Sequence, residues 1–244
     1  MRVIGSVKED LGLEKRVSIT PETLKKYLSL GFSINLEKNY AEHLGFYDDE
    51  YKDIGANIID SKKDVLEKSD IILSVNCPLF DEVKLIKNES IFIGQLDPNT
   101  HKDLINQLLQ KNIKIFSLNL LPRITRAQSM DILSSQANLA GYKAVVESFA
   151  KFERAIPMMM TAAGTVPAAK VLIIGAGVAG LQAIATAKRM GAIVFATDVR
   201  EASKEQVESL GGKFLMVENS ENLETEGGYA KETSEDFKKK QESL

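Results

Sequence analysis

Short apolar runs alternate with helical patterns along the first 120 residues of the chain. Each run is rich in aliphatic and β-branched residues, and turn residues or amphipathic segments follow it. Strands are expected at residues 2–7, 33–37, 57–59, 70–75, 90–94 and 114–118. Helices are expected at 62–68, at 100–110 and after Thr20, which precedes a first-turn proline and acid, Pro21 and Glu22. This alternation predicts a parallel, doubly wound sheet.

The pattern changes at residues 126–153, which contain no proline and a single glycine, Gly141. Apolar residues there repeat near the helical period, which indicates one long helix. Beyond it the alternation resumes, with expected strands at 170–174, 192–197 and 213–217 and helices at 178–190 and 203–210. The chain is therefore predicted to be an α/β protein with two doubly wound parallel-sheet domains. The predicted parts are a flavodoxin-like domain (1–125), a crossing helix (126–155) and a Rossmann domain (156–244).

The second domain is expected to be incomplete at its C-terminus. A full dinucleotide-binding sheet has the strand order 3-2-1-4-5-6, and only strands 1, 2 and 3 can be found after residue 169. Its first strand, residues 171–174, would then be an apolar edge. The polar stretch after Glu218 lacks apolar periodicity and is expected to form a mobile loop near 219–232 and then a solvated helix.

Charge and cysteine content narrow the possible functions. The net charge of −3 leaves no basic stripe to neutralise phosphates, so we expect no nucleic-acid partner. The single cysteine, Cys77, cannot form an internal disulfide and is expected to be a small buried hydrophobe. With His43 and His101, the only histidines, it shows no zinc-binding spacing, so no metal site is expected.

One stretch of the chain has few charges and could suggest a membrane-spanning helix. Between residues 155 and 187 the only charge is Lys170. Prolines and glycines interrupt the stretch, and its uncharged segments of 15 and 17 residues are shorter than the ~20 that a spanning helix needs. We therefore expect no direct membrane span.

The most informative motif is the sequence GAGVAG at residues 175–180, which follows a predicted strand and opens a predicted helix. Gly175 suits the tight turn, Gly177 lets the backbone approach a pyrophosphate, and Gly180 lets the helix pack close to the strand. Asp198 ends the next strand, 18 positions later, where a carboxylate accepts from an adenosine ribose. That carboxylate favours NAD over NADP, although Arg200 nearby can accommodate a 2′-phosphate.

A second polar stretch, PRITRAQSMDILS at residues 122–134, follows the last strand of the first domain. Its arginine, glutamine, aspartate and serine side chains can hydrogen-bond a carboxamide and a ribose. They can also simply cap the long helix and solvate its first turns. Composition alone favours this second interpretation.

This stretch, with PMMMTAAGTVPAAKVLIIGAGVAGLQAIATAKRMGA, ATDVR, KEQVESLGGKF and GGYAK, resembles the NAD(H)-binding component (alpha subunit, domain I) of proton-translocating NAD(P) transhydrogenase. The N-terminal KEDLGLEKRVSITPE fits the wider family, which includes alanine dehydrogenase. The resemblance implies cofactor-binding residues and no catalytic acid or base. They are Arg123, Gln128, Asp131 and Ser134 around the nicotinamide, with Arg126 as a further contact, Gly175, Gly177, Val178 and Gly180 at the pyrophosphate, Asp198, Val199 and Arg200 at the adenosine, and Gly228 and Tyr229 in the mobile loop.

The resemblance also implies an activity and partners. Hydride would pass directly between NADH bound to this chain and NADP bound to a partner component, while a membrane component couples the transfer to proton translocation. The complete protein would be a homodimer on the cytoplasmic face of a bacterial-type inner membrane, held there by its partner subunits. Little activity is expected from this chain alone, and a truncated, non-catalytic NAD-binding module is one alternative.

An alanine dehydrogenase-like enzyme is the other alternative. The substrate pocket of that branch relies on an arginine, a lysine and a histidine, and Arg16 matches the arginine. The lysine should fall within residues 75–78 and the histidine within 95–97, but neither segment holds one. His101 is the only candidate nearby, at a predicted helix start. Because oxidation of an amino acid requires a proton acceptor, the missing histidine counts against this alternative.

Overall fold

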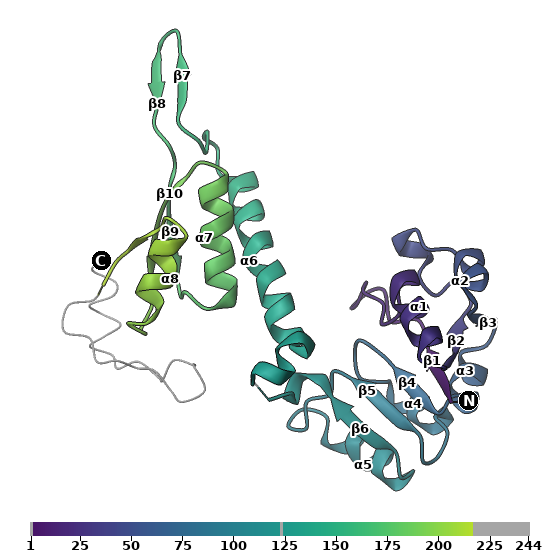
Figure 1. Ribbon diagram of the computed structural model, residues 1–244. Helices are drawn as coiled ribbons and strands as arrows, with labels where there is room; N and C mark the ends of the chain where they lie inside the picture. The colour runs from purple at the N-terminus through teal and green to yellow at the C-terminus, as the bar shows by residue number, and fades with distance from the viewer. Residues whose placement is uncertain (1, 123, 217–244) are drawn as a thin grey trace. The chain divides into compact units, whose positions relative to one another are not determined.

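The computed structural model describes residues 2–122 and 124–216 (Figure 1). The chain divides into two compact units, residues 1–130 (unit 1) and residues 131–244 (unit 2). Both are α/β units with parallel sheets, as the alternating pattern predicts. Within the described residues, no helix is long and apolar enough to cross a membrane.

Unit 1 contains one parallel sheet with the order β3-β2-β1-β4-β5-β6. Its strands are β1 (Val3–Ser6), β2 (Ser33–Glu37), β3 (Asn57–Ile59), β4 (Ile71–Leu73), β5 (Ile91–Gly94) and β6 (Lys114–Ser117). The order reverses at β1, which pairs with both β2 and β4. The sheet is doubly wound, but the flavodoxin-like label is corrected because a flavodoxin-like sheet has the order 2-1-3-4-5.

Helices cover both faces of this sheet, and each face has its own apolar core. They are α1 (Pro21–Ser29), α2 (Asp48–Ile54), α3 (Lys62–Lys68), α4 (Phe80–Leu85) and α5 (Lys102–Gln110), with 3₁₀ turns η1 (Glu42–Leu44), η2 (Leu118–Leu120) and η3 (Thr125–Met130). Ile71 and Leu73 of β4 pack in one core and Ile72 in the other, because successive strand residues point to opposite faces. The cores hold the carboxyl ends of the strands in fixed positions.

Unit 2 begins with a long helix and a hairpin, followed by a three-stranded parallel sheet in the order β11-β10-β9 (Figure 1). Its elements are α6 (Ile132–Lys151), β7 (Met159–Thr161), β8 (Gly164–Val166), β9 (Lys170–Ile174), α7 (Val178–Arg189), β10 (Ile193–Thr197), α8 (Ser203–Ser209) and β11 (Lys213–Phe214). Helix α6 packs along α7, and side chains from α6, α7, α8 and the sheet share one core.

Two details of unit 2 bear on the sequence predictions. The crossing helix is shorter than the predicted 126–155, because the Asp131 carboxylate caps α6 by accepting from the Ser134 amide at 2.9 Å. Residues before it form η3 instead. Strand β9 lies at the sheet edge in the described part of unit 2, and Leu172 and Ile174 are exposed. Within the described residues, β9 is therefore an edge strand with exposed apolar side chains.

Candidate functional site

The glycine motif forms a tight turn between β9 and α7 in unit 2. Gly175 has φ +92°, a left-handed conformation that glycine adopts without steric cost, and its amide donates to the Thr197 carbonyl at 2.8 Å. A Cβ at Gly180 would clash with the carbonyl oxygen of Gly175. The turn itself therefore requires glycine at both positions.

Gly177, the N-cap residue of α7, has a different environment. Its φ of −76° and ψ of −169° suit any residue, and no described heavy atom outside its neighbours lies within 4 Å of the position that a Cβ would take. No side chain in the described residues caps α7 at this end, so its first amides have no capping partner there. Val178, the first helical residue, is also exposed. The arrangement presents free N–H groups and a helix dipole to an anion.

Asp198 lies directly after β10, beside this turn. Its Oδ2 accepts from the Ala176 amide at 2.6 Å, and its Oδ1 accepts from the Arg200 amide at 2.9 Å. The Arg200 guanidinium donates from Nε to Oδ1 and from Nη2 to Oδ2, both at 2.9 Å. Burial raises the pKa of Asp198, but the hydrogen bonds from Arg200 and Ala176 outweigh it and leave the pKa below its usual value. The carboxylate is therefore charged and anchors the turn.

The polar stretch is divided between the two units. Arg126 and Gln128 are exposed in η3 of unit 1, whereas Asp131 and Ser134 begin α6 in unit 2. Asp131 Oδ2 also accepts from the Ser134 hydroxyl at 2.6 Å, so both side chains contribute to the cap. Ser134 lies seven residues before Gly141, which contacts Ala179 in the first turn of α7. That spacing along a helix is about 10 Å.

Three of the predicted contacts fall on residues that the structure does not describe: Arg123, Gly228 and Tyr229. Val199 is half-buried in the bend after β10, between Asp198 and Arg200. The structure therefore brings together the predicted pyrophosphate and adenosine residues of unit 2, at the carboxyl ends of β9 and β10.

Unit 1 contains a cavity of about 720 Å³ at the carboxyl edge of its sheet. Residues that follow β1, β4, β5 and β6 line it, among them Glu9, Asn76, Cys77, Asp97 and Asn119. Ligands of doubly wound sheets bind at this edge, where the strand order reverses. Glu9 and Lys62 of this cavity are not among the residues predicted from the sequence, although the position of Glu9 just after β1 could have indicated it.

The cavity residues differ from the lysine and histidine that an alanine dehydrogenase-like pocket would need. The segments where they are expected supply Asn76, Cys77, Gln95, Leu96 and Asp97 to the lining. Burial raises the pKa of the Cys77 thiol, which is half-buried.

The two remaining candidates for that pocket are held in place by neighbouring groups. His101 does line the cavity, but it starts α5 and its Nδ1 lies 2.8 Å from the Thr100 hydroxyl. Arg16 pairs with Glu14 through Nε and Nη2 at 2.8 and 2.6 Å.

The glycine turn, the helix that follows it and the aspartate after the next parallel strand place unit 2 in the Rossmann class of α/β folds. The chain belongs to the alanine dehydrogenase/PNT family. The model of the family's N-terminal domain matches residues 5–140, and the model of its C-terminal domain matches residues 144–240. The predicted family is thereby confirmed.

Within this family the chain is more similar to transhydrogenases than to alanine dehydrogenases. It is 50% identical to the first part of NAD(P) transhydrogenase subunit alpha of Rhodospirillum rubrum, over 98% of this chain and 64% of the relative. The crystal structure of transhydrogenase from Sinorhizobium meliloti matches with a TM-score of 0.83 and 46% identity, over 88% of this chain and 64% of that chain. Alanine dehydrogenase of Methanococcus maripaludis is 27% identical, over 91% of this chain and 60% of the relative. The chain thus spans less than two thirds of these relatives.

Proposed function

We propose that this chain is the NAD(H)-binding part of a proton-translocating NAD(P) transhydrogenase. Unit 2 binds NADH, and a partner component binds NADP. When both nucleotides are bound, a hydride leaves the dihydronicotinamide of NADH and joins the nicotinamide of NADP⁺, which gives NAD⁺ and NADPH. A membrane component couples this transfer to proton translocation, and the assembly contains two copies of this chain on the cytoplasmic face of the membrane.

The role of this chain's residues is positioning. The amides of the Gly177 turn and the first turn of α7 hold the pyrophosphate, and Asp198 accepts from the adenosine ribose. Arg123, Gln128, Asp131 and Ser134 orient the nicotinamide, with Arg126 as a further contact, and Gly228 and Tyr229 close over the nucleotide. Direct hydride transfer needs no acid or base, so the protein accelerates it by orientation and by exclusion of water.

The observation that carries the nucleotide assignment is the open space at Gly177. The fold accounts for glycine at 175 by its positive φ and at 180 by its contact with the Gly175 carbonyl, but it does not require glycine at 177. Close approach of a ligand to the backbone does require it. The unpaired amide groups at the same place suit a negatively charged pyrophosphate.

Gly177→Ala tests this assignment. It should leave the melting temperature within error of wild type and weaken NADH binding about tenfold, because the methyl group occupies the path of the pyrophosphate. NADH fluorescence titrations into the millimolar range measure the affinity. Gly180→Ala is the matched control, since it adds the same methyl group where the fold has no room and should lower the melting temperature. Equal NADH affinity in wild type and Gly177→Ala would contradict the assignment.

A mixing experiment distinguishes the reaction from that of an alanine dehydrogenase-like enzyme. With the NADP-binding component of the Rhodospirillum rubrum transhydrogenase, the chain should support NADH-dependent reduction of NADP⁺. Pyruvate and ammonia should not oxidise NADH in its presence, because the unit 1 segments expected to supply the lysine and histidine hold Asn76, Cys77 and Asp97 instead. Oxidation of NADH by pyruvate and ammonia would reverse the choice between the two reactions.

A further inference from the structure

The carboxylate of Asp198 is fully engaged within unit 2. From described residues it accepts four hydrogen bonds, two from the amides of Ala176 and Arg200 and two from Nε and Nη2 of Arg200. A carboxylate offers about four lone-pair positions. Only 6% of the Asp198 side chain is exposed, and 19% of the Arg200 side chain that pairs with it. A ribose hydroxyl therefore finds no vacant acceptor site on this carboxylate.

The four donors differ in how easily they can leave. The amides of Ala176 and Arg200 belong to the backbone of the glycine turn and of the bend after β10, and the fold fixes both. The guanidinium stands at the end of a long side chain with several rotatable bonds, and the Arg200 side chain is more exposed than that of Asp198. Its rotation away from Asp198 frees one position on each oxygen, and these two positions match the two hydroxyls of a ribose.

We propose that Arg200 determines the affinity and nucleotide specificity of the site by occupying the ribose-binding carboxylate of Asp198. The proposal rests on the proposed function, in which unit 2 binds NADH. NADH must displace the guanidinium before its adenosine ribose reaches Asp198, so Arg200 lowers the affinity for NADH. After displacement the guanidinium stays close to the ribose, because the Arg200 side chain limits how far it can move. There it can pair with the 2′-phosphate of NADPH. One residue thus acts against NADH and in favour of NADPH.

Arg200→Ala tests the proposal because NADH affinity should rise while the melting temperature of the free chain falls. NADH should bind about tenfold more tightly, since no charge-assisted pair has to be broken before the ribose binds. NADPH should bind no more tightly than it does to wild type. The melting temperature of the free chain should fall, because Asp198 loses its guanidinium partner. A purely structural role for Arg200 predicts instead that affinity and melting temperature fall together.

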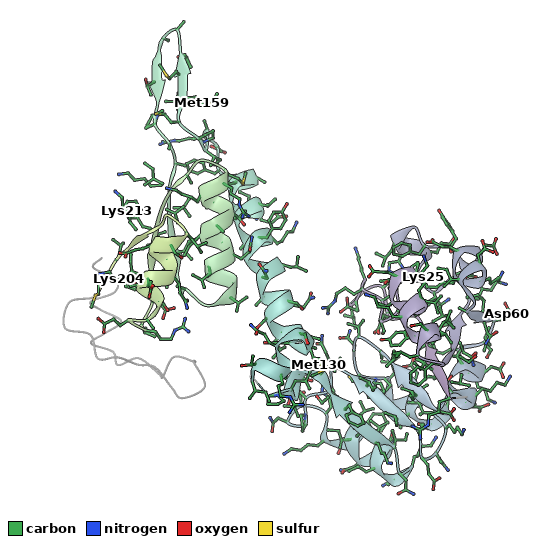
Figure 2. The ribbon with its side chains drawn as sticks, viewed as in Figure 1. Lys25, Asp60, Met130, Met159, Lys204 and Lys213 are labelled. Atoms are coloured by element: carbon green, nitrogen blue, oxygen red, sulfur yellow. The ribbon has the colours of Figure 1, made fainter. Side chains whose placement is uncertain are left out.

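Two further variants and one ligand sharpen the comparison. Lys204→Ala removes one positive charge from the exposed side of α8 (Figure 2) and should leave NADH affinity unchanged. Arg200→Lys keeps the positive charge but loses the bidentate hydrogen bonding of the guanidinium. Its NADH affinity should therefore lie between those of wild type and Arg200→Ala. An NADH analogue with 2′-deoxyadenosine should gain less from Arg200→Ala than NADH does, because it lacks one of the two hydroxyls.

The outcomes separate the two proposals. If wild type binds NADH and Arg200→Ala binds it equally or more weakly, the role given to Arg200 is wrong and the proposed function stands. If Arg200→Ala also improves NADPH binding as much as NADH binding, the specificity part is wrong. If neither wild type nor Arg200→Ala binds NADH in the millimolar range, the proposed function fails, and the role of Arg200 fails with it.

Discussion

Single side chains in unit 2 link the glycine turn to the end of β10. The Asp198 carboxylate holds the Ala176 amide on one oxygen and the Arg200 amide on the other, so it ties the two segments that would contact the pyrophosphate and the ribose. The Arg200 guanidinium donates to the same two oxygens. The charge on Asp198 therefore supports the shape of the turn as well as any bound ribose.

This charge makes the stability of unit 2 depend on pH. The pKa of Asp198 lies below its unfolded value, so its ionised form stabilises the fold above that value and the contribution is lost as pH falls through the lowered pKa. At pH 7, Asp198→Asn should cost about 2 kcal/mol, the range for hydrogen bonds to a charged group. Thermal unfolding between pH 7 and pH 3 checks this. The gap between wild type and variant should shrink below about pH 4, and a constant gap would contradict it.

Sequence alone located the glycine turn and Asp198, because both follow from fixed spacing around a strand and a helix. Sequence alone could not show whether Arg200 points toward a nucleotide or pairs with Asp198. The direction of its side chain depends on the bend after β10, which brings the guanidinium onto the Asp198 carboxylate. The capping by Asp131 was one of two open interpretations, and its hydrogen bond to the Ser134 amide shows that it occurs. Whether Asp131 also contacts a nicotinamide stays a prediction.

Among the described helices of unit 2, α6 and α7 pack together most extensively. A Cβ at Gly141 of α6 would clash with the carbonyl oxygen of Ala179 in the first turn of α7. The absence of a side chain at Gly141 therefore lets the two backbones meet. Because Ala179 belongs to the glycine motif, this contact also helps to hold the motif in place.

Gly141→Ala tests this contact against helix propensity. In an exposed helix, glycine to alanine stabilises by roughly 0.5–1 kcal/mol. At Gly141, overpacking costs about 1–3 kcal/mol and outweighs that gain, so the free energy of unfolding of unit 2 should fall. Urea denaturation measures the change. Asn138→Ala, on the exposed surface of α6, is the control and should be neutral or slightly stabilising. A stabilised Gly141→Ala variant would show that α6 can move away without cost.

The elements found by sequence reasoning are those with a clear period. Strands β2, β3 and β9 and helix α3 have the predicted bounds, and α1 starts at the predicted cap. Helices α2 and α4 were not predicted, because each is seven residues or fewer and buries only one side chain, Tyr51 and Val83 respectively. The hairpin β7–β8 was also missed, since its methionines are exposed without alternation; Figure 2 labels Met159 there.

At the scale of the whole chain, the described apolar cores fall into two separate sets. The two cores of unit 1 draw on residues 4–115, and the core of unit 2 draws on residues 145–214, without a shared member among the described residues. Unit 1 has an apolar core on each face of its sheet, whereas the described part of unit 2 has one core and exposes Leu172 and Ile174 on β9. Because buried apolar area is the main source of stability, unit 2 should be the less stable.

Thermal unfolding of the chain should accordingly show two transitions, with unit 2 melting first. A matched pair of substitutions assigns them, since Ile34 in unit 1 and Ile184 in unit 2 are both fully buried. Each change to valine removes one methylene group and should cost about 0.5–1.5 kcal/mol. Ile184→Val should lower only the first midpoint and Ile34→Val only the second.

NADH at about 100 times its Kd should raise the first midpoint, because a ligand of the folded state stabilises the unit that binds it by about 2.7 kcal/mol. A single transition lowered equally by both substitutions would mean that the two units unfold as one cooperative body, and the separate cores would then not determine how the chain unfolds.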